Sequence, residues 1–130
     1  IKQNQIEKLV DFIGWIKESD IPNYLSITKL GLSPLHKNIH HDTTYANKVF
    51  QYISIGCPVV SSNVIAQSEL VKKYEIGVIF EDNNVFDLSD KIIELHNDKN
   101  LYSRLKQNCL DSIEKLNNSV ISNQLISIYE

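Results

Sequence analysis

The side chains best suited to chemistry lie in one polar segment that begins at His36 and ends at Asp42, with His40 and His41 adjacent inside it. Imidazoles and a carboxylate can hold a metal ion, but their spacing here matches no common zinc pattern, so we expect neither a metal nor another cofactor. An imidazole changes charge near neutral pH and can instead act as an acid, a base or a hydrogen-bond donor to phosphate. His36 and His40 are the candidates for that role, because each follows a strand end or opens the loop. A solvated polar loop is the alternative.

An amphipathic helix is predicted directly after this segment. Thr43 or Thr44 can cap its start, and Gly56 can end it, because many helices end on a residue with a positive φ. Its apolar stripe consists of Ala46, Val49, Phe50 and Ile53. The opposite, polar stripe consists of Thr44, Asn47, Lys48 and Gln51. Such a helix packs on a sheet and turns a hydrogen-bonding face outward.

The start of this helix is a candidate anion site. First-turn N–H groups have no acceptor within a helix, and the helix dipole favours negative charge beside them. We predict that the N–H groups of Thr44, Tyr45 and Ala46 are donors to a phosphate. On the residues alone, a capped helix whose polar stripe faces solvent explains the pattern as well.

Four short apolar runs are predicted to be β-strands, and amphipathic helices alternate with them. The strands are Leu9–Ile13, Leu30–Leu35, Pro58–Ser62 and Gly77–Phe80. The helices are expected around residues 21–27, 44–55, 66–74, 85–95, 101–113 and 121–128. This alternation is typical of a parallel sheet with right-handed crossovers. The predicted fold class is therefore α/β, a Rossmann-like parallel sheet with helices on both faces.

The carboxyl ends of parallel strands meet at one edge of a sheet, and ligands of such sheets bind there. This rule predicts that four loop segments lie at the same edge. They are Gly14–Ile16, Leu35–Asp42, Ser61–Asn63 and Glu81–Asn84. The predicted anion site lies at this edge too, because the helix begins there.

Composition narrows the classes of protein that the chain can belong to. The formal net charge of −3 argues against a nucleic-acid-binding module, which is usually basic. No apolar run approaches the length of a membrane span, and no signal peptide is found. Cys57 and Cys109 match no metal or redox spacing and are expected to be reduced, buried thiols. The chain also holds no complete catalytic constellation and no Gly-rich nucleotide fingerprint.

Several stretches, in this order, resemble the GT-B glycosyltransferases, and among them family 4. They are Val10–Ile16, Ile21–Leu25, Leu30–Leu35, Asn47–Tyr52, Gly56–Val60, Glu69–Val71 and Gly77–Phe80. The strongest piece is Gly56-Cys57-Pro58-Val59-Val60 after its helix. The resemblance covers nearly the whole chain, and its ordered spacing is more specific than any single motif.

The resemblance implies most of a carboxyl-terminal, donor-binding domain. Residues 1–130 would be a single Rossmann-like nucleotide-sugar-binding domain without its first strands and without the amino-terminal acceptor domain. A chain that opens on Ile1 rather than on Met agrees with a fragment of a longer polypeptide. By the same resemblance, Trp15 and Ile16 correspond to neighbours of the nucleotide base.

Members of the family carry a Glu-x7-Glu pair that binds the sugar and the ribose of the donor. The corresponding positions are Thr43 and Gln51, so both acids are absent. Gln51 can still hydrogen-bond a ribose hydroxyl. Ala46 stands where the family has a glycine in the phosphate turn, and Lys48 matches a lysine of a polysaccharide-assembly branch.

The resemblance therefore implies a retaining glycosyltransferase that moves a sugar from a nucleotide-sugar to a polysaccharide or lipid-linked acceptor, in bacterial surface polysaccharide synthesis. The expected location is the cytoplasm, and peripheral association of the full-length protein with the inner face of the membrane is compatible with it. The candidate donor-binding residues are Trp15, Ile16, His36, His40, Thr43, Thr44, Tyr45, Ala46, Asn47, Lys48 and Gln51. No catalytic residue is assigned, and the fragment alone is expected to bind a nucleotide without turnover.

Two alternatives stay open. Loss of both glutamates supports a non-catalytic α/β binding module, either a degenerate transferase domain or one that docks a partner. A sugar-nucleotide epimerase of the same GT-B architecture is the other reading.

Overall fold

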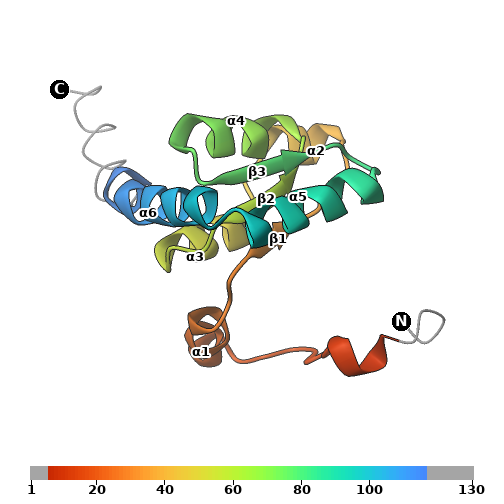
Figure 1. The fold of residues 1–130 in the computed structure, drawn as a ribbon, viewed down its shortest axis with the longest axis vertical. Helices are drawn as coiled ribbons and strands as arrows, with labels where there is room; N and C mark the ends of the chain where they lie inside the picture. Colours follow the sequence, from red (N-terminus) through yellow and green to blue (C-terminus); the bar gives the residue numbers. More distant parts are fainter. Residues whose placement is uncertain (1–5, 117–130) are drawn as a thin grey trace.

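The computed structural model describes residues 6–116 and contains a parallel sheet of three strands with helices on both faces (Figure 1). The strands are β1 (Gly31–Ser33), β2 (Val59–Ser62) and β3 (Gly77–Phe80), with β2 in the middle. Leu32 of β1 and Val78 of β3 both pair with Val60 of β2. The predicted fold class is confirmed, and so are three of the four predicted strands.

Helices connect and flank these strands. They are α1 (Ile21–Ser26), α2 (Ile39–Thr43), α3 (Asn47–Ser54), α4 (Ile65–Tyr74), α5 (Val85–Asn97) and α6 (Lys99–Leu116), with short 3-10 helices η2 (Glu7–Leu9) and η3 (Glu18–Asp20). Asn84 caps α5, since its side chain accepts a hydrogen bond from the N–H of Asp87. The helix predicted around residues 121–128 lies outside the described residues.

Successive side chains of β2 point to opposite faces of the sheet, so the apolar core has two parts. Val59 packs with Val49 and Ile53 of α3 and with Leu70 of α4. Its neighbour Val60 points the other way, into a second cluster made mainly by α5 and the first half of α6. Both valines are fully buried, as expected for a strand that is covered on both faces. The sheet therefore separates two apolar cores, one on each face.

Two glycines suit the backbone at their positions, one by adopting a positive φ and the other by letting two strands approach closely. Gly56 follows α3 with a φ of +68°, the left-handed conformation predicted for the end of this helix. Gly77 starts β3, and a Cβ there would lie 1.9 Å from the backbone oxygen of Val59. The second glycine thus lets β3 lie directly against β2.

The predicted strand Leu9–Ile13 is wrong. Leu9 ends η2, the residues after it form neither helix nor strand, and the side chains of Leu9 and Phe12 are each 82% exposed. In Figure 1 this segment and α1 stand apart from the sheet. A β-branched and aromatic run becomes a strand only when a neighbouring strand supplies hydrogen bonds, and none of the described residues pairs with it.

The two cysteines are buried and unpaired, as predicted. The thiol of Cys109 contacts the backbone oxygen of Ile76 at 3.4 Å. Burial raises the pKa of Cys57 to about 11 and that of Cys109 to about 12. Neither group is therefore a nucleophile near neutral pH. Within residues 6–116 there is also no helix with the length and apolar character that crossing a membrane requires.

Candidate functional site

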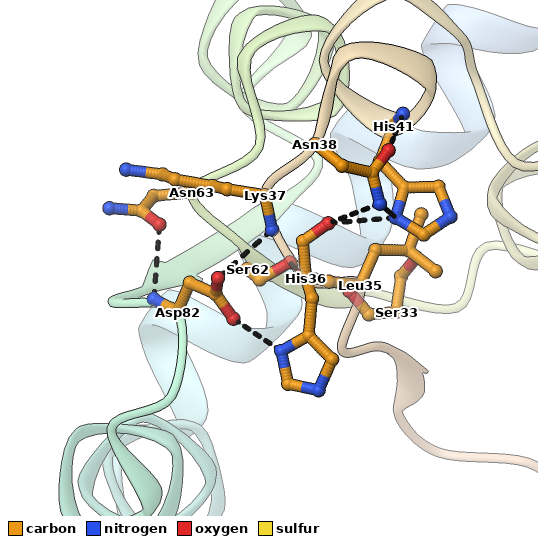
Figure 2. A network of polar contacts seen from close by, with 9 residues as sticks. All are labelled: Ser33, Leu35, His36, Lys37, Asn38, His41, Ser62, Asn63 and Asp82. Atoms are coloured by element: carbon orange, nitrogen blue, oxygen red, sulfur yellow. Dashed lines mark hydrogen bonds and ion pairs between the residues drawn. The ribbon is translucent and has the colours of Figure 1, made fainter.

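Asp82 joins the loops that follow all three strands (Figure 2). Its Oδ1 lies 2.8 Å from Nδ1 of His36, and its Oδ2 accepts a hydrogen bond of 2.9 Å from the N–H of Lys37. The N–H of Asp82 donates to Oδ1 of Asn63 at 3.0 Å. Because the partners come from the loops after β1 and β2, the carboxyl edge of the sheet is one connected polar surface. We call these four residues the Asp82 network.

Hydrogen bonds favour the ionised form of the Asp82 carboxyl group. The N–H of Lys37 and the imidazole of His36 both donate to Asp82 and lower the pKa of its carboxyl group. The side chain of Asp82 is 12% exposed, whereas that of His36 is 72% exposed. The network therefore consists of a sheltered carboxylate beneath an imidazole that faces solvent.

Buried hydroxyl groups at the ends of β1 and β2 form further hydrogen bonds at the same edge. The hydroxyl of Ser62, at the end of β2, donates to the backbone oxygen of Leu35 at 2.5 Å. The hydroxyl of Ser33, at the end of β1, donates to Oε1 of Gln67 at 2.6 Å. Ser33, Ser62 and Gln67 are fully buried, so these bonds are shielded from competing water. The bond of Ser62 holds the loop that carries His36 against the sheet, and the bond of Ser33 joins β1 to α4.

The segment predicted as a loop between His36 and Asp42 contains the short helix α2. Asn38 caps this helix, because its side chain accepts a hydrogen bond from the N–H of His41 at 2.8 Å. The ring of His41 turns back, and its Nδ1 lies 2.7 Å from the backbone oxygen of His36. The histidine segment is thus internally hydrogen-bonded rather than a free loop, which sequence reasoning missed although Asn38 is a strong cap residue.

The predicted start of the next helix is also wrong. Thr43 is the last residue of α2, and Thr44 caps its carboxyl end, while α3 begins at Asn47 after Ala46. The hydroxyl of Thr43 donates to the backbone oxygen of Ile39, and that of Thr44 to the backbone oxygen of His40. Both threonines therefore close one helix rather than open the next, because a hydroxyl can bond back to the preceding turn.

The candidate phosphate donors shift with the helix start. In α3 the first-turn N–H groups belong to Asn47 and Lys48, not to Thr44, Tyr45 and Ala46, and no side chain caps them. Since α3 connects two parallel strands, it begins at the carboxyl edge, beside the loop after β1. Anion binding at this helix start stays a prediction, and the observed helix start lies at Asn47, with Ala46 at the N-cap.

The polar stripe of α3 lies partly in solvent. Asn47 and Gln51 are exposed, and Lys48 is half-buried. Burial lowers the pKa of the Lys48 ammonium. Tyr45 is 50% exposed and packs edge-on against Phe50, with ring centroids 5.9 Å apart. Charge at this face is therefore carried by a cation that is partly desolvated.

Three predicted site residues lie outside both the Asp82 network and the stretch from Thr43 to Gln51. His40 is exposed on α2, with its ring centroid 5.5 Å from that of His41. Trp15, which is 84% exposed, and the half-buried Ile16 belong to the segment that stands apart from the sheet. Of the four segments predicted at one edge, three meet there, and Gly14–Ile16 is not joined to them. The role of these residues in donor binding stays a prediction.

Asp82 and Asn63 were missed as site residues. Both stand directly after strands, in segments that the strand-end rule placed at the edge, so a signal existed. The pattern could not tell whether Glu81 or Asp82 turns inward. Among the residues that the structure describes, no group of three or more His, Cys, Asp or Glu side chains could hold a metal ion.

Comparison with known proteins identifies the class. The model of the family Glycosyl transferases group 1 matches residues 1–110. A crystal structure of the C-terminal domain of a glycosyl transferase group 1 family protein, LpcC from Francisella tularensis, superposes with a TM-score of 0.73 at 22% identity. The match covers 88% of this chain and 57% of that one. The chain therefore belongs to the glycosyl transferases group 1 family, with the fold of a GT-B carboxyl-terminal domain.

Two curated relatives agree with the family. The chain is 33% identical over 96 residues to a chitobiosyldiphosphodolichol beta-mannosyltransferase of Candida glabrata, a match that covers 74% of this chain and 20% of that protein. It is 21% identical over 101 residues to a putative teichuronic acid biosynthesis glycosyltransferase, TuaH, of Bacillus subtilis, covering 76% of this chain and 25% of that protein. The chain thus spans between a fifth and a quarter of the length of these relatives.

Proposed function

We propose that this chain is the donor-binding part of a glycosyltransferase, which moves a sugar from a nucleotide-sugar to a saccharide or lipid-linked acceptor. Membership of the family and the names of both curated relatives support the activity. The observation that carries the site is that two polar features lie at the same carboxyl edge of the sheet. The uncapped start of α3 lies there, and so does the Asp82 network.

Each feature suits a part of a nucleotide-sugar. The N–H groups of Asn47 and Lys48 bind the diphosphate, because a helix start offers free donors and a favourable dipole. The carboxamide of Gln51, one turn further along α3, hydrogen-bonds a ribose hydroxyl without adding charge. The family resemblance assigns Trp15 and Ile16 to the base, and their segment stands apart from the sheet (Figure 1). The acceptor is held by a part of the protein outside this chain.

The finer features of the reaction belong to the same proposal. The sugar is transferred with retained configuration. No metal ion is needed, because hydrogen bonds and cations at the edge stabilise the leaving diphosphate. The product is a bacterial surface polysaccharide, made in the cytoplasm at the inner face of the membrane. The relative named for teichuronic acid biosynthesis supports the polysaccharide, whereas the yeast relative supports a lipid-linked acceptor.

Calorimetric titration of the chain with UDP, GDP and their sugar conjugates tests this function. We expect binding of one nucleotide class with one site per chain. Heat from none of these ligands would overturn the donor-binding proposal.

One observation favours a second function, a non-catalytic α/β binding module. Thr43, at the position of the first family glutamate, closes α2 through its hydroxyl, which lies 2.8 Å from the oxygen of Ile39. Gln51 stands at the position of the second glutamate. The variants Thr43→Glu and Gln51→Glu, singly and together, discriminate the two functions. A gain in nucleotide affinity supports the donor site, and silence from every variant supports the binding module.

A further inference from the structure

The hydrogen bond between His36 and Asp82 fixes the orientation of the imidazole ring. Asp82 binds its Nδ1 at 2.8 Å, so the proton on that nitrogen points at the carboxylate. The carboxylate cannot turn, because its other oxygen accepts from the N–H of Lys37 and its backbone N–H donates to Asn63. The ring of His36 is therefore held by a partner that is itself held on two sides.

The second ring nitrogen is left for a ligand. None of the described residues hydrogen-bonds to Nε2 of His36, and the side chain is 72% exposed. In Figure 2 one nitrogen of this ring faces Asp82 and the other faces away from the network. The ring of His41, by contrast, uses its Nδ1 within the loop, close to the backbone oxygen of His36. Of these two imidazoles, only that of His36 is presented outward by a carboxylate.

A surface ion pair that only ties loops together is the simpler explanation, but the contacts weaken it. The N–H of Lys37 already joins the loop after β1 to Asp82, and Asn63 joins the loop after β2. The imidazole is not needed for either link, and an exposed pair adds little stability. What the pair adds is an oriented nitrogen at the edge where α3 begins. The ammonium of Lys48, in the first turn of α3, is half-buried, which disfavours its charged form.

We propose that the imidazolium form of His36, with its Nδ1–H oriented by Asp82, donates its Nε2–H to a phosphate of the diphosphate group of the nucleotide ligand. His36 is then a binding residue, and Asp82 is a positioning residue that acts through it. This inference rests on the proposed function, because it names a contact within the same donor site. A hydrogen bond from an imidazolium to a phosphate oxygen is charge-assisted, and so it is among the stronger polar contacts that a protein makes.

The variants His36→Gln and Asp82→Asn test the proposal, with His96→Gln as the matched control. His96 is an exposed imidazole in the last turn of α5, outside the Asp82 network. Calorimetry with UDP and GDP should give an affinity about tenfold weaker for His36→Gln, the loss of one charge-assisted hydrogen bond. Asp82→Asn should weaken binding less, because the imidazole remains but is no longer oriented. His96→Gln should bind as the wild type does.

NMR of the histidine rings supplies a readout that a purely structural role would not move. Adding inorganic diphosphate or the bound nucleotide to the wild type should shift the ring signals of His36 and leave those of His96 in place. Wild-type affinity in His36→Gln, or unmoved His36 signals, would overturn the inference while the donor function stands. No nucleotide binding by the wild type would overturn both. Geranyl diphosphate serves as a third ligand, and dependence on His36 for this ligand alone would overturn the assignment to a nucleotide.

Discussion

The carboxylate of Asp42 on α2 accepts a hydrogen bond of 3.0 Å from the backbone N–H of Ile65, the first residue of α4. No side chain of its own segment caps α4, so Asp42 satisfies one of the N–H groups that every helix start leaves free. The bond crosses from the short helix of the candidate site to a helix of the core. It therefore fixes the place of α2, the element that leads into α3.

Replacing Asp42 with alanine should lower the free energy of unfolding by roughly 1 kcal/mol, because α4 loses its cap and its favourable charge. Asp42→Asn should keep most of the stability, since a carboxamide oxygen also accepts from an N–H. Urea denaturation measures both. Asp90→Ala, on the exposed side of α5, is the control and should change stability by less than about 0.5 kcal/mol. Equal losses for Asp42→Ala and Asp90→Ala would contradict the capping role.

The pairing of β2 with β3 depends on Gly77. A Cβ at this position would lie 1.9 Å from the backbone oxygen of Val59, which cannot move without breaking the sheet. We expect Gly77→Ala to lose about 2 to 3 kcal/mol of stability, the range of an overpacked core. Thermal unfolding compares the Gly77→Ala protein with a Ser89→Ala control, which changes an exposed position of α5. A Gly77→Ala protein as stable as the wild type would mean that the register of β3 is wrong.

How much the sequence could predict differs between the core and the edge. Val59 and Val60 follow a helix that ends at a glycine, and this local pattern is sufficient to predict β2 and its burial. Leu9–Ile13 is also a short apolar run, but it has no partner strand among the described residues, so the pattern predicted a strand wrongly. Propensity describes what a segment tolerates, whereas pairing decides what it becomes.

The candidate site shows the same division. The strand-end rule brought the loops of His36, Asn63 and Asp82 to one edge, because it depends only on strand direction. The start of α3 was misplaced, since Thr43 and Thr44 suit a helix end as well as a helix start. Hydrogen bonds between residues far apart in the sequence, such as that of Lys37 with Asp82, leave no periodic trace.

The Asp82 network should make the free energy of unfolding decrease as the pH falls. Hydrogen bonds lower the pKa of Asp82 in the folded state below the unfolded value near 4. Its contribution is thus fully present above about pH 4 and is lost as the pH falls through the lower, folded value. Urea unfolding of the wild type and of Asp82→Asn at pH 7, 5 and 3 measures this. The difference in stability between the two proteins should be smaller at pH 3 than at pH 5, and a difference that widens in acid would contradict the network.

The thiols should resist alkylation in the folded protein. With the pKa of Cys57 raised to about 11 and that of Cys109 to about 12, almost no thiolate forms at pH 8, and both groups are buried. Iodoacetamide should label neither in buffer and both in urea, as mass spectrometry can show. A Ser89→Cys variant supplies an exposed thiol that should react in buffer. Rapid labelling of Cys57 or Cys109 in the folded wild type would contradict their burial.

The same thiols predict a loss of stability in alkali. An unfolded cysteine ionises near pH 9, so their contribution is complete below that pH and falls as the pH rises through about 11. Cys57→Ala should flatten this decline in urea unfolding between pH 8 and 11. An unchanged slope would assign the decline to other groups.

The central claim is that a nucleoside diphosphate binds at the carboxyl edge, between the start of α3 and the Asp82 network. Backbone amide NMR during titration with UDP and GDP tests it most directly. We expect shifts concentrated at Asn47, Lys48, Lys37 and Asp82, with little change at Glu75 and Gly77 at the opposite edge of the sheet. Shifts centred on Glu75 and Gly77, or no shifts with either nucleotide, would contradict it.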